Sequence, residues 1–114
     1  MAIRSNVEAA PQTIGTIDTN IFSVTAPITR ANLTKLWVYN TSTTERAEVR
    51  FYVSPNNTSA SGTYIDRVIL ASEMGAPCNG LIGYSVPQGL NVIAVADVTG
   101  VECLISSTEY DEDS

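Results

Sequence analysis

The sequence predicts an all-β protein: a two-sheet antiparallel β-sandwich of jelly-roll or Greek-key type with about eight strands. Short apolar runs recur along the chain between turn-forming residues. Only 16% of the residues are charged, and Thr, Ser and Asn supply most of the polar surface. Thr suits the pleated surface of a strand, whereas Ser and Asn suit turns. No apolar stripe with a helical period of about 3.6 residues persists, so no ordinary helix is expected.

The first four expected strands cover residues 13–17, 21–26, 33–40 and 46–54. The first carries two isoleucines around a glycine, and the second is a short apolar run that ends at Pro27. The third is apolar on one face and carries Trp37 and Tyr39 on the other, which predicts a central strand. The fourth alternates strictly, as a half-buried antiparallel strand does. Its predicted inward residues are Ala47, Val49, Phe51 and Val53.

The last four expected strands cover residues 63–71, 81–86, 90–98 and 101–108. Polar loops at 55–62 and 72–80 precede the first two of them, and Pro87 ends the second. The run at 90–98 is rich in β-branched residues, which favours a buried strand. In the final run, one face should carry Val101, Cys103 and Ile105 toward the core.

The chain has 114 residues, which favours one domain. We expect a sandwich domain over 13–108, an N-terminal arm over 1–12 and an acidic C-terminal tail over 109–114. The arm carries Ile3, Arg4 and Val7, and an extended segment of this kind can add to the sheet edge of a neighbouring protein. The alternative is that the arm packs on its own domain as an edge strand.

Charge excludes some partners. The formal net charge is −6, and the six basic residues are scattered along the chain, so binding to nucleic acid or an anionic membrane is not expected. We find no signal peptide and no membrane-spanning window, so synthesis in a cytoplasm is expected. In a reducing compartment Cys78 and Cys103 should be free thiols, although a disulfide between them stays open.

The sequence contains few of the residues that enzyme active sites commonly use. The chain has no histidine, which removes the commonest general base and metal ligand. We therefore expect no enzyme, no cofactor and no metal site. Two weaker possibilities are a pair of carboxylates acting on a glycosidic bond, and a calcium ion bound by Asp18, Asp66 or Asp97 in a loop. No ordered spacing of oxygen ligands supports the calcium site.

Three aromatic residues are candidate contact residues: Trp37, Tyr39 and Tyr52. Aromatic side chains are enriched both in cores and at protein interfaces, so a core or intersubunit contact is the preferred interpretation. The other possibility is a platform on which sugar rings stack.

The order of several segments resembles that of small β-sandwich proteins from the virions of tailed bacteriophages. The matching segments are "IFSVTAP" at 21–27, "LTKLWVYNTS" at 33–42, "AEVRFYV" at 47–53, "IDRVILAS" at 65–72, "VPQGLNVIAVAD" at 86–97 and "VECLISSTEY" at 101–110. The chain departs from that pattern at "QGLN", where Gly-Asp is more usual, and in its N-terminal arm.

The resemblance implies a non-enzymatic structural protein located in the virion. We expect capsid decoration as the role, with the major capsid protein as partner and a homo-oligomer, preferably a trimer, as the assembly. The alternatives are a neck, tail or fibre component, or a carbohydrate- or receptor-binding module. The resemblance transfers no catalytic residue.

Overall fold

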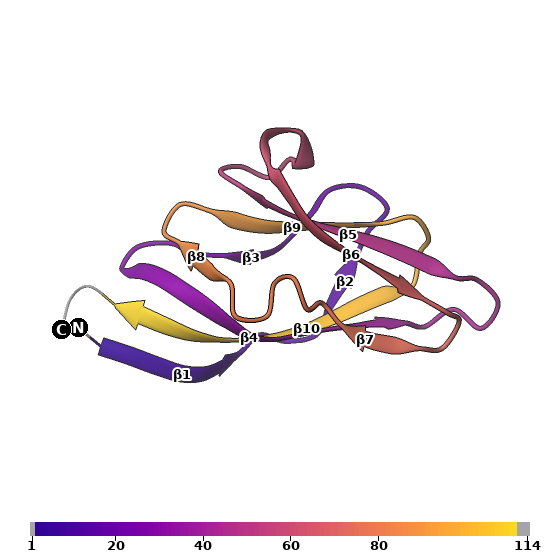
Figure 1. Ribbon diagram of the computed structural model, residues 1–114, viewed down its shortest axis with the longest axis horizontal. Coiled ribbons are helices and arrows are strands. Elements are labelled where there is room, and N and C mark those ends of the chain that lie inside the picture. The colour runs from indigo at the N-terminus through magenta and orange to yellow at the C-terminus, as the bar shows by residue number, and fades with distance from the viewer. Residues whose placement is uncertain (1, 112–114) are drawn as a thin grey trace.

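Two antiparallel β-sheets pack face to face, and no α-helix lies between or beside them in residues 2–111 (Figure 1). The structure is a computed structural model that describes these residues, and the side chains of all of them except 2, 4, 5 and 6. The predicted fold class, an all-β antiparallel sandwich, is confirmed. The molecule is elongated, with extents of 49 × 28 × 20 Å.

The larger sheet has six strands and the smaller has four. The strand order of the larger sheet is β1 (Ala2–Glu8), β10 (Val101–Asp111), β4 (Ile28–Asn40), β7 (Gly75–Pro77). In the same sheet β2 (Gln12–Ile14) also pairs with β10, and β8 (Ser85–Pro87) also pairs with β4. The smaller runs β3 (Thr19–Ser23), β9 (Asn91–Ala96), β5 (Ala47–Ser54), β6 (Thr63–Leu70). A single turn of 3-10 helix, η1, covers Ser59–Ser61.

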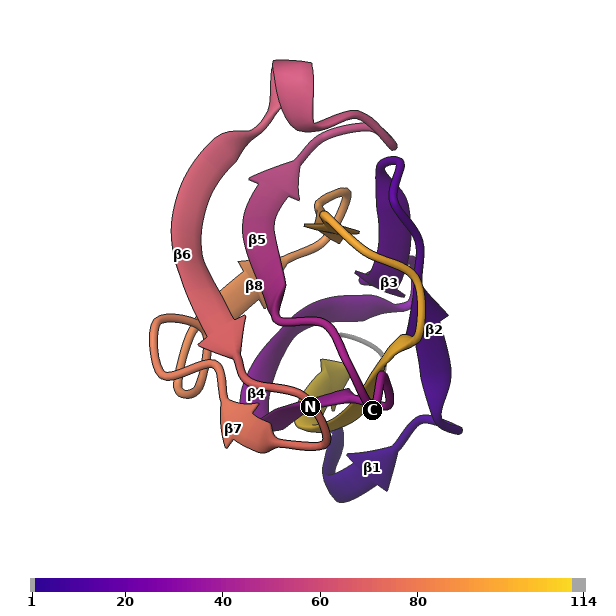
Figure 2. The same ribbon diagram turned by 90° about the vertical axis from the view of Figure 1, so that its right-hand side faces the viewer.

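The connections give a jelly roll. The chain changes sheet at each step except β1 to β2, β5 to β6 and β7 to β8. The two outer positions of the larger sheet are each filled by a broken strand: β1 and β2 pair with successive parts of β10, and β7 and β8 with successive parts of β4. Figure 2 shows β1 and β2 along one side of the molecule and β6 and β7 along the other.

The core lies between the two sheets and consists of the residues that alternation turns inward. The predicted inward face of β5 is buried, and so are the three predicted inward residues of β10. Phe51 is fully buried and is the largest of these side chains. Burial of such side chains is worth about 1.5–3 kcal/mol each relative to exposure. Cys78 and Cys103 are both buried, free thiols.

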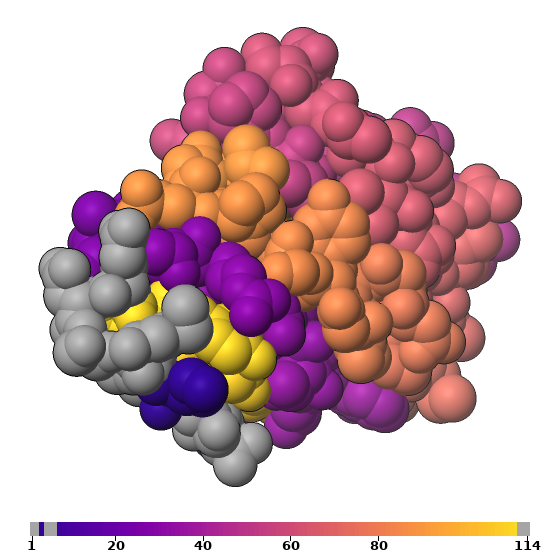
Figure 3. Space-filling model, turned by 60° about the vertical axis from the view of Figure 1, so that its left-hand side comes forward, coloured from indigo at the N-terminus to yellow at the C-terminus, as the bar shows by residue number. Residues whose placement is uncertain are grey.

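Residues 72–87 differ most from the expected strands. The expected loop at 72–80 contains β7, and the expected strand at 81–86 is mostly turn, with only β8 at its end. Backbone hydrogen bonds from Leu81 to Cys78 and from Tyr84 to Leu81 close successive turns there. Leu81 is nevertheless fully buried, so a loop residue contributes its apolar side chain to the core. Figure 3 shows the orange segment that contains this loop beside the purple β4.

Both ends of the expected sandwich domain extend further than 13–108. The segment expected as an arm contains β1 and the start of β2, and β1 pairs with β10 of its own sheet, which is the alternative arrangement. Ala2 pairs with Asp111, so β10 includes the first part of the expected acidic tail. The remainder of the tail, 112–114, lies outside the described residues. Backbone pairing on both edges of β10 explains why its acidic end continues the strand.

Candidate functional site: an aromatic groove on the six-stranded sheet

Trp37 and Tyr39 lie on the outer face of the six-stranded sheet. They alternate along β4 with Leu36 and Val38, whose side chains are fully buried in the core. The two aromatic side chains remain 40% and 39% exposed. Because strand alternation fixes the faces, two large rings are held at the surface with no layer over them in the described chain.

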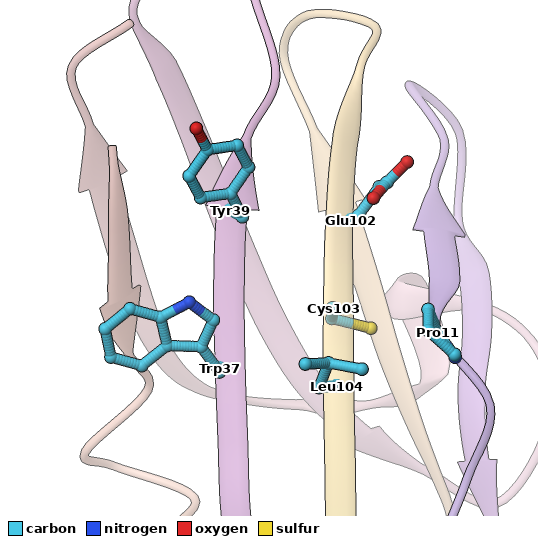
Figure 4. A pocket seen from close by; sticks show the side chains of 6 residues that line it. All are labelled: Pro11, Trp37, Tyr39, Glu102, Cys103 and Leu104. Atoms are coloured by element: carbon cyan, nitrogen blue, oxygen red, sulfur yellow. The ribbon is translucent and has the colours of Figure 1, made fainter. Parts of the chain in front are cut away.

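Gly75 makes room for the indole of Trp37. A Cβ atom on Gly75 would lie 2.7 Å from the indole Nε1 and 2.8 Å from Cζ2, closer than real side chains approach. The ring therefore lies against the backbone of β7, which pairs with β4 at this point. Figure 4 shows the indole leaning away from β10, so that the surface between β4 and β2 stays open.

A groove of about 260 Å³ results, and its lining comes from two strands, β4 and β10, and one loop (Figure 4). Its lining residues are Pro11, Trp37, Tyr39, Glu102, Cys103 and Leu104. In the register of β4 and β10, Leu104 is opposite Trp37 and Glu102 is opposite Tyr39. Pro11 stands on the far side, just before β2. The groove is thus apolar along its length with one carboxylate at one end.

The carboxylate of Glu102 is exposed and has no ion-pair or hydrogen-bond partner among the described residues. Glu48, on the outer face of the other sheet, is different: it forms ion pairs with Arg50 at 2.8 Å and with Arg67 at 3.6 Å. The hydrogen bond and charge of Glu48 raise the pKa of Arg50. The groove therefore carries an uncompensated negative charge, whereas the acid on the opposite face is compensated.

Cys103 does not supply a nucleophile to the groove. Burial raises the pKa of its thiol to about 12, so the thiol is neutral near neutral pH, whereas the thiolate is the reactive form. The thiol of Cys78 has its pKa raised to about 12 as well, first by burial and then by the nearby charge of Asp66. Neither cysteine is a reactive group in the folded chain.

The other predicted contact residues lie elsewhere. Tyr52 is on the four-stranded sheet and packs edge-on against Tyr64, with ring centroids 5.6 Å apart. It cannot share one platform with the two groove aromatics. On β1, Ile3 is 59% exposed and Val7 is half-buried, while the backbone of Arg4 pairs with Glu109.

The acids considered as calcium ligands are dispersed. Carboxylate oxygens of Asp18, Asp66 and Asp97 accept hydrogen bonds from the backbone N–H groups of Ser59, Gly80 and Glu48, respectively, and each thereby fixes a different loop or strand end. Within residues 2–111 no group of three or more His, Cys, Asp or Glu could hold a metal ion. No helix of that part of the chain is long and apolar enough to cross a membrane.

A second hollow lies on the outer face of the four-stranded sheet and has a volume of about 290 Å³. Its lining residues are Glu48, Arg50, Val95, Ala96 and Asp97. Glu48 forms an ion pair with Arg50 there, and the carboxylate of Asp97 accepts a hydrogen bond from the backbone N–H of Glu48. This surface has the character of a solvated ion-pair cluster.

Comparison with known proteins gives a structural likeness only. No protein-family profile and no curated protein matches the sequence. The fold is similar to that of a solved structure described in the work "Bacillus endospore appendages form a novel family of disulfide-linked pili", with a TM-score of 0.53, 13% identity, and coverage of 96% of this chain and 88% of that chain. At this identity the likeness establishes a shared fold.

A chain from the structure of infectious bursal disease virus Gt strain is also similar, with 12% identity and a TM-score of 0.37. The match covers 95% of this chain and 32% of the viral chain. At this score the likeness adds nothing to the assignment of the fold.

The sequence identified the two groove aromatics but not the other lining residues. Pro11, Glu102 and Leu104 come from segments far from Trp37 in the chain, and they meet it only through the pairing of β10 with β4 and β2. The sequence predicts that Gly75 lies in the loop at 72–80, where a glycine is ordinary. The alternation of residues 101–108, which turns Cys103 toward the core, also indicates that Leu104 lies on the opposite face.

Proposed function

We propose that this chain is a non-enzymatic structural protein of a bacteriophage virion, acting as a capsid decoration protein. The observation that carries the proposal is the exposed aromatic groove on a stable sandwich face. Trp37 and Tyr39 lie outside the core and expose apolar ring surface to solvent. Exposed aromatic side chains of this kind are enriched at protein–protein interfaces. The major capsid protein is the proposed partner, and the virion is the proposed location.

Two further features support assembly through non-covalent contacts. β1 is the outermost strand along half of β10, so its free edge can accept a strand from a neighbouring subunit. Ile3 lies on this strand and is exposed. The structurally similar Bacillus appendage is described as disulfide-linked, whereas both cysteines of this chain are buried with protonated thiols. A homotrimer held by sheet edges and apolar faces fits these features.

Cosedimentation with empty capsids of the encoding phage tests the decoration role. We expect the wild-type protein to pellet with capsids at a fixed ratio to the major capsid protein. Trp37→Ala should reduce this ratio, whereas Tyr64→Ala, which removes an exposed ring from the opposite sheet, should leave it unchanged. Recovery of the protein only with tails or necks would transfer the proposal to the alternative structural role.

A carbohydrate- or receptor-binding module is the second candidate, and the same groove favours it. Sugar rings stack on half-exposed aromatic faces, and Glu102 could accept hydrogen bonds from sugar hydroxyl groups. Binding to a glycan array that disappears in Trp37→Ala, with the fold retained, would support this candidate over the structural role.

A further inference from the structure

We propose that the aromatic groove binds the arginine or lysine side chain of an extended basic segment in the partner protein. This inference rests on the proposed function and specifies the chemistry of the partner. Its basis is the combination of two half-exposed aromatic rings, an apolar floor and a carboxylate without a cation.

The rings supply the first part of the recognition. Trp37 and Tyr39 occupy successive outward positions of β4, and a cation placed over an aromatic face is attracted by the ring quadrupole. The chain uses such a contact elsewhere: the guanidinium of Arg30 lies 4.0 Å from the centroid of the Tyr110 ring on the same sheet. Among the residues whose side chains the structure describes, none that lines the groove is basic.

Glu102 distinguishes a cation from a neutral ligand. Glu102 is the strand partner of Tyr39, its side chain is directed toward the Pro11 side of the groove (Figure 4), and its carboxylate has no counter-ion among the residues that the structure describes. A guanidinium can form a two-pronged hydrogen bond with a carboxylate, which a neutral ligand cannot match in charge. A sugar would use the rings but leave the charge uncompensated. The net charge of −6 adds a long-range attraction for a basic partner.

The dimensions favour a single side chain. At about 260 Å³ the groove is smaller than the clefts of about 300–1,000 Å³ that hold drug-sized ligands. The alkyl stem of an arginine or lysine can lie along Leu104 and Pro11 while its charged end reaches Glu102. An extended segment could present this side chain and continue along the sheet face.

The fluorescence of Trp37 provides a direct test, because it is the one tryptophan of the chain. The probe is the peptide acetyl-Gly-Arg-Gly-Arg-Gly-amide, and the matched peptide carries citrulline, a neutral analogue of arginine, in both positions. We expect a saturable change in Trp37 emission with the arginine peptide and binding at least about ten-fold weaker with the citrulline peptide. Raising the salt from about 20 to about 500 mM should weaken the arginine peptide's binding.

Two variants separate a local from a global charge effect. Glu102→Gln should weaken binding of the arginine peptide by about ten-fold, whereas Glu45→Gln, which removes an exposed carboxylate elsewhere, should change it by less than about two-fold. Equal binding of both peptides, an unchanged affinity in Glu102→Gln, or saturable binding of maltotriose in place of the arginine peptide would overturn the proposal.

The peptide-binding experiment tests the groove separately from the proposed role in the virion. Capsid cosedimentation without peptide binding would overturn the groove proposal and leave the structural role standing. Selective peptide binding without any association with capsids, necks or tails would overturn the structural role and leave the groove as a binding site for basic segments.

Discussion

Asn40 is the last residue of β4, and its buried side chain donates a 2.7 Å hydrogen bond to the backbone carbonyl of Glu45. The same amide donates to the carbonyl of Ala71 at 3.3 Å, and its oxygen accepts from the N–H of Ser42. One side chain thus ties the β4–β5 connection to the chain beyond β6. A buried polar group that loses its partners is costly, so this residue should matter for stability.

Asn40→Ala is expected to lower the free energy of unfolding by about 1–3 kcal/mol, because it leaves the carbonyls of Glu45 and Ala71 and the N–H of Ser42 without their side-chain partner. Urea unfolding followed by circular dichroism measures the change. Asn57→Ala is the control, since Asn57 is exposed and its side-chain oxygen accepts a hydrogen bond from the amide of Asn20; its cost should be below about 0.5 kcal/mol. Equal costs for the two variants would contradict this role of Asn40.

Gly75→Ala should displace the indole of Trp37, because the new methyl group would lie 2.7 Å from the indole nitrogen. The ring is half-exposed and can swing outward, so the expected loss of stability is modest, about 1 kcal/mol. Tryptophan emission should shift to longer wavelength as the ring becomes more exposed. In a Trp37→Ala background the same glycine substitution should cost almost nothing, and a full cost there would show that the ring is not the obstacle.

The free energy of unfolding should fall as the pH rises from about 9 toward about 12. Burial raises the pKa of Cys103 from 9.0 to about 12, so the unfolded chain loses this proton first and gains stability relative to the folded chain. Each such thiol steepens the fall by up to about 1.4 kcal/mol per pH unit. Below its unfolded pKa the effect is absent.

Cys103→Ala should therefore flatten this pH dependence, as measured by urea unfolding at a series of alkaline pH values. The comparison uses slopes, because the substitution also changes the packing of the core. Identical slopes in the variant and the wild type would mean that Cys103 ionises equally easily in the folded state.

Deletion of residues 2–8 should leave a folded sandwich that no longer joins the larger assembly. The nine strands from β2 onward retain both sheets, and β10 keeps its pairing with β4. Circular dichroism checks the fold and capsid cosedimentation checks incorporation. Deletion of 112–114 is the matched control and should affect neither. Normal incorporation of the folded β1 deletion would remove β1 from the proposed interface.

Alternation in the sequence predicts which face of a strand each side chain lies on. The inward face of β5 and the placement of Trp37 on the face opposite Leu36 both follow from a period of about two residues, and both are found in the structure. Pairing between distant segments is not local: the contact of β10 with β4, and of β1 with β10, depends on tertiary packing. The predicted strand at 81–86 is wrong, because Leu81 is buried as part of a turn and not as part of a strand.

Sedimentation velocity of the purified protein at micromolar concentration tests most directly whether this chain works by assembly. The account predicts a homotrimer as the main species, with wild-type and Tyr64→Ala proteins alike. A single monomeric species of 12.2 kDa across the concentration range would contradict it.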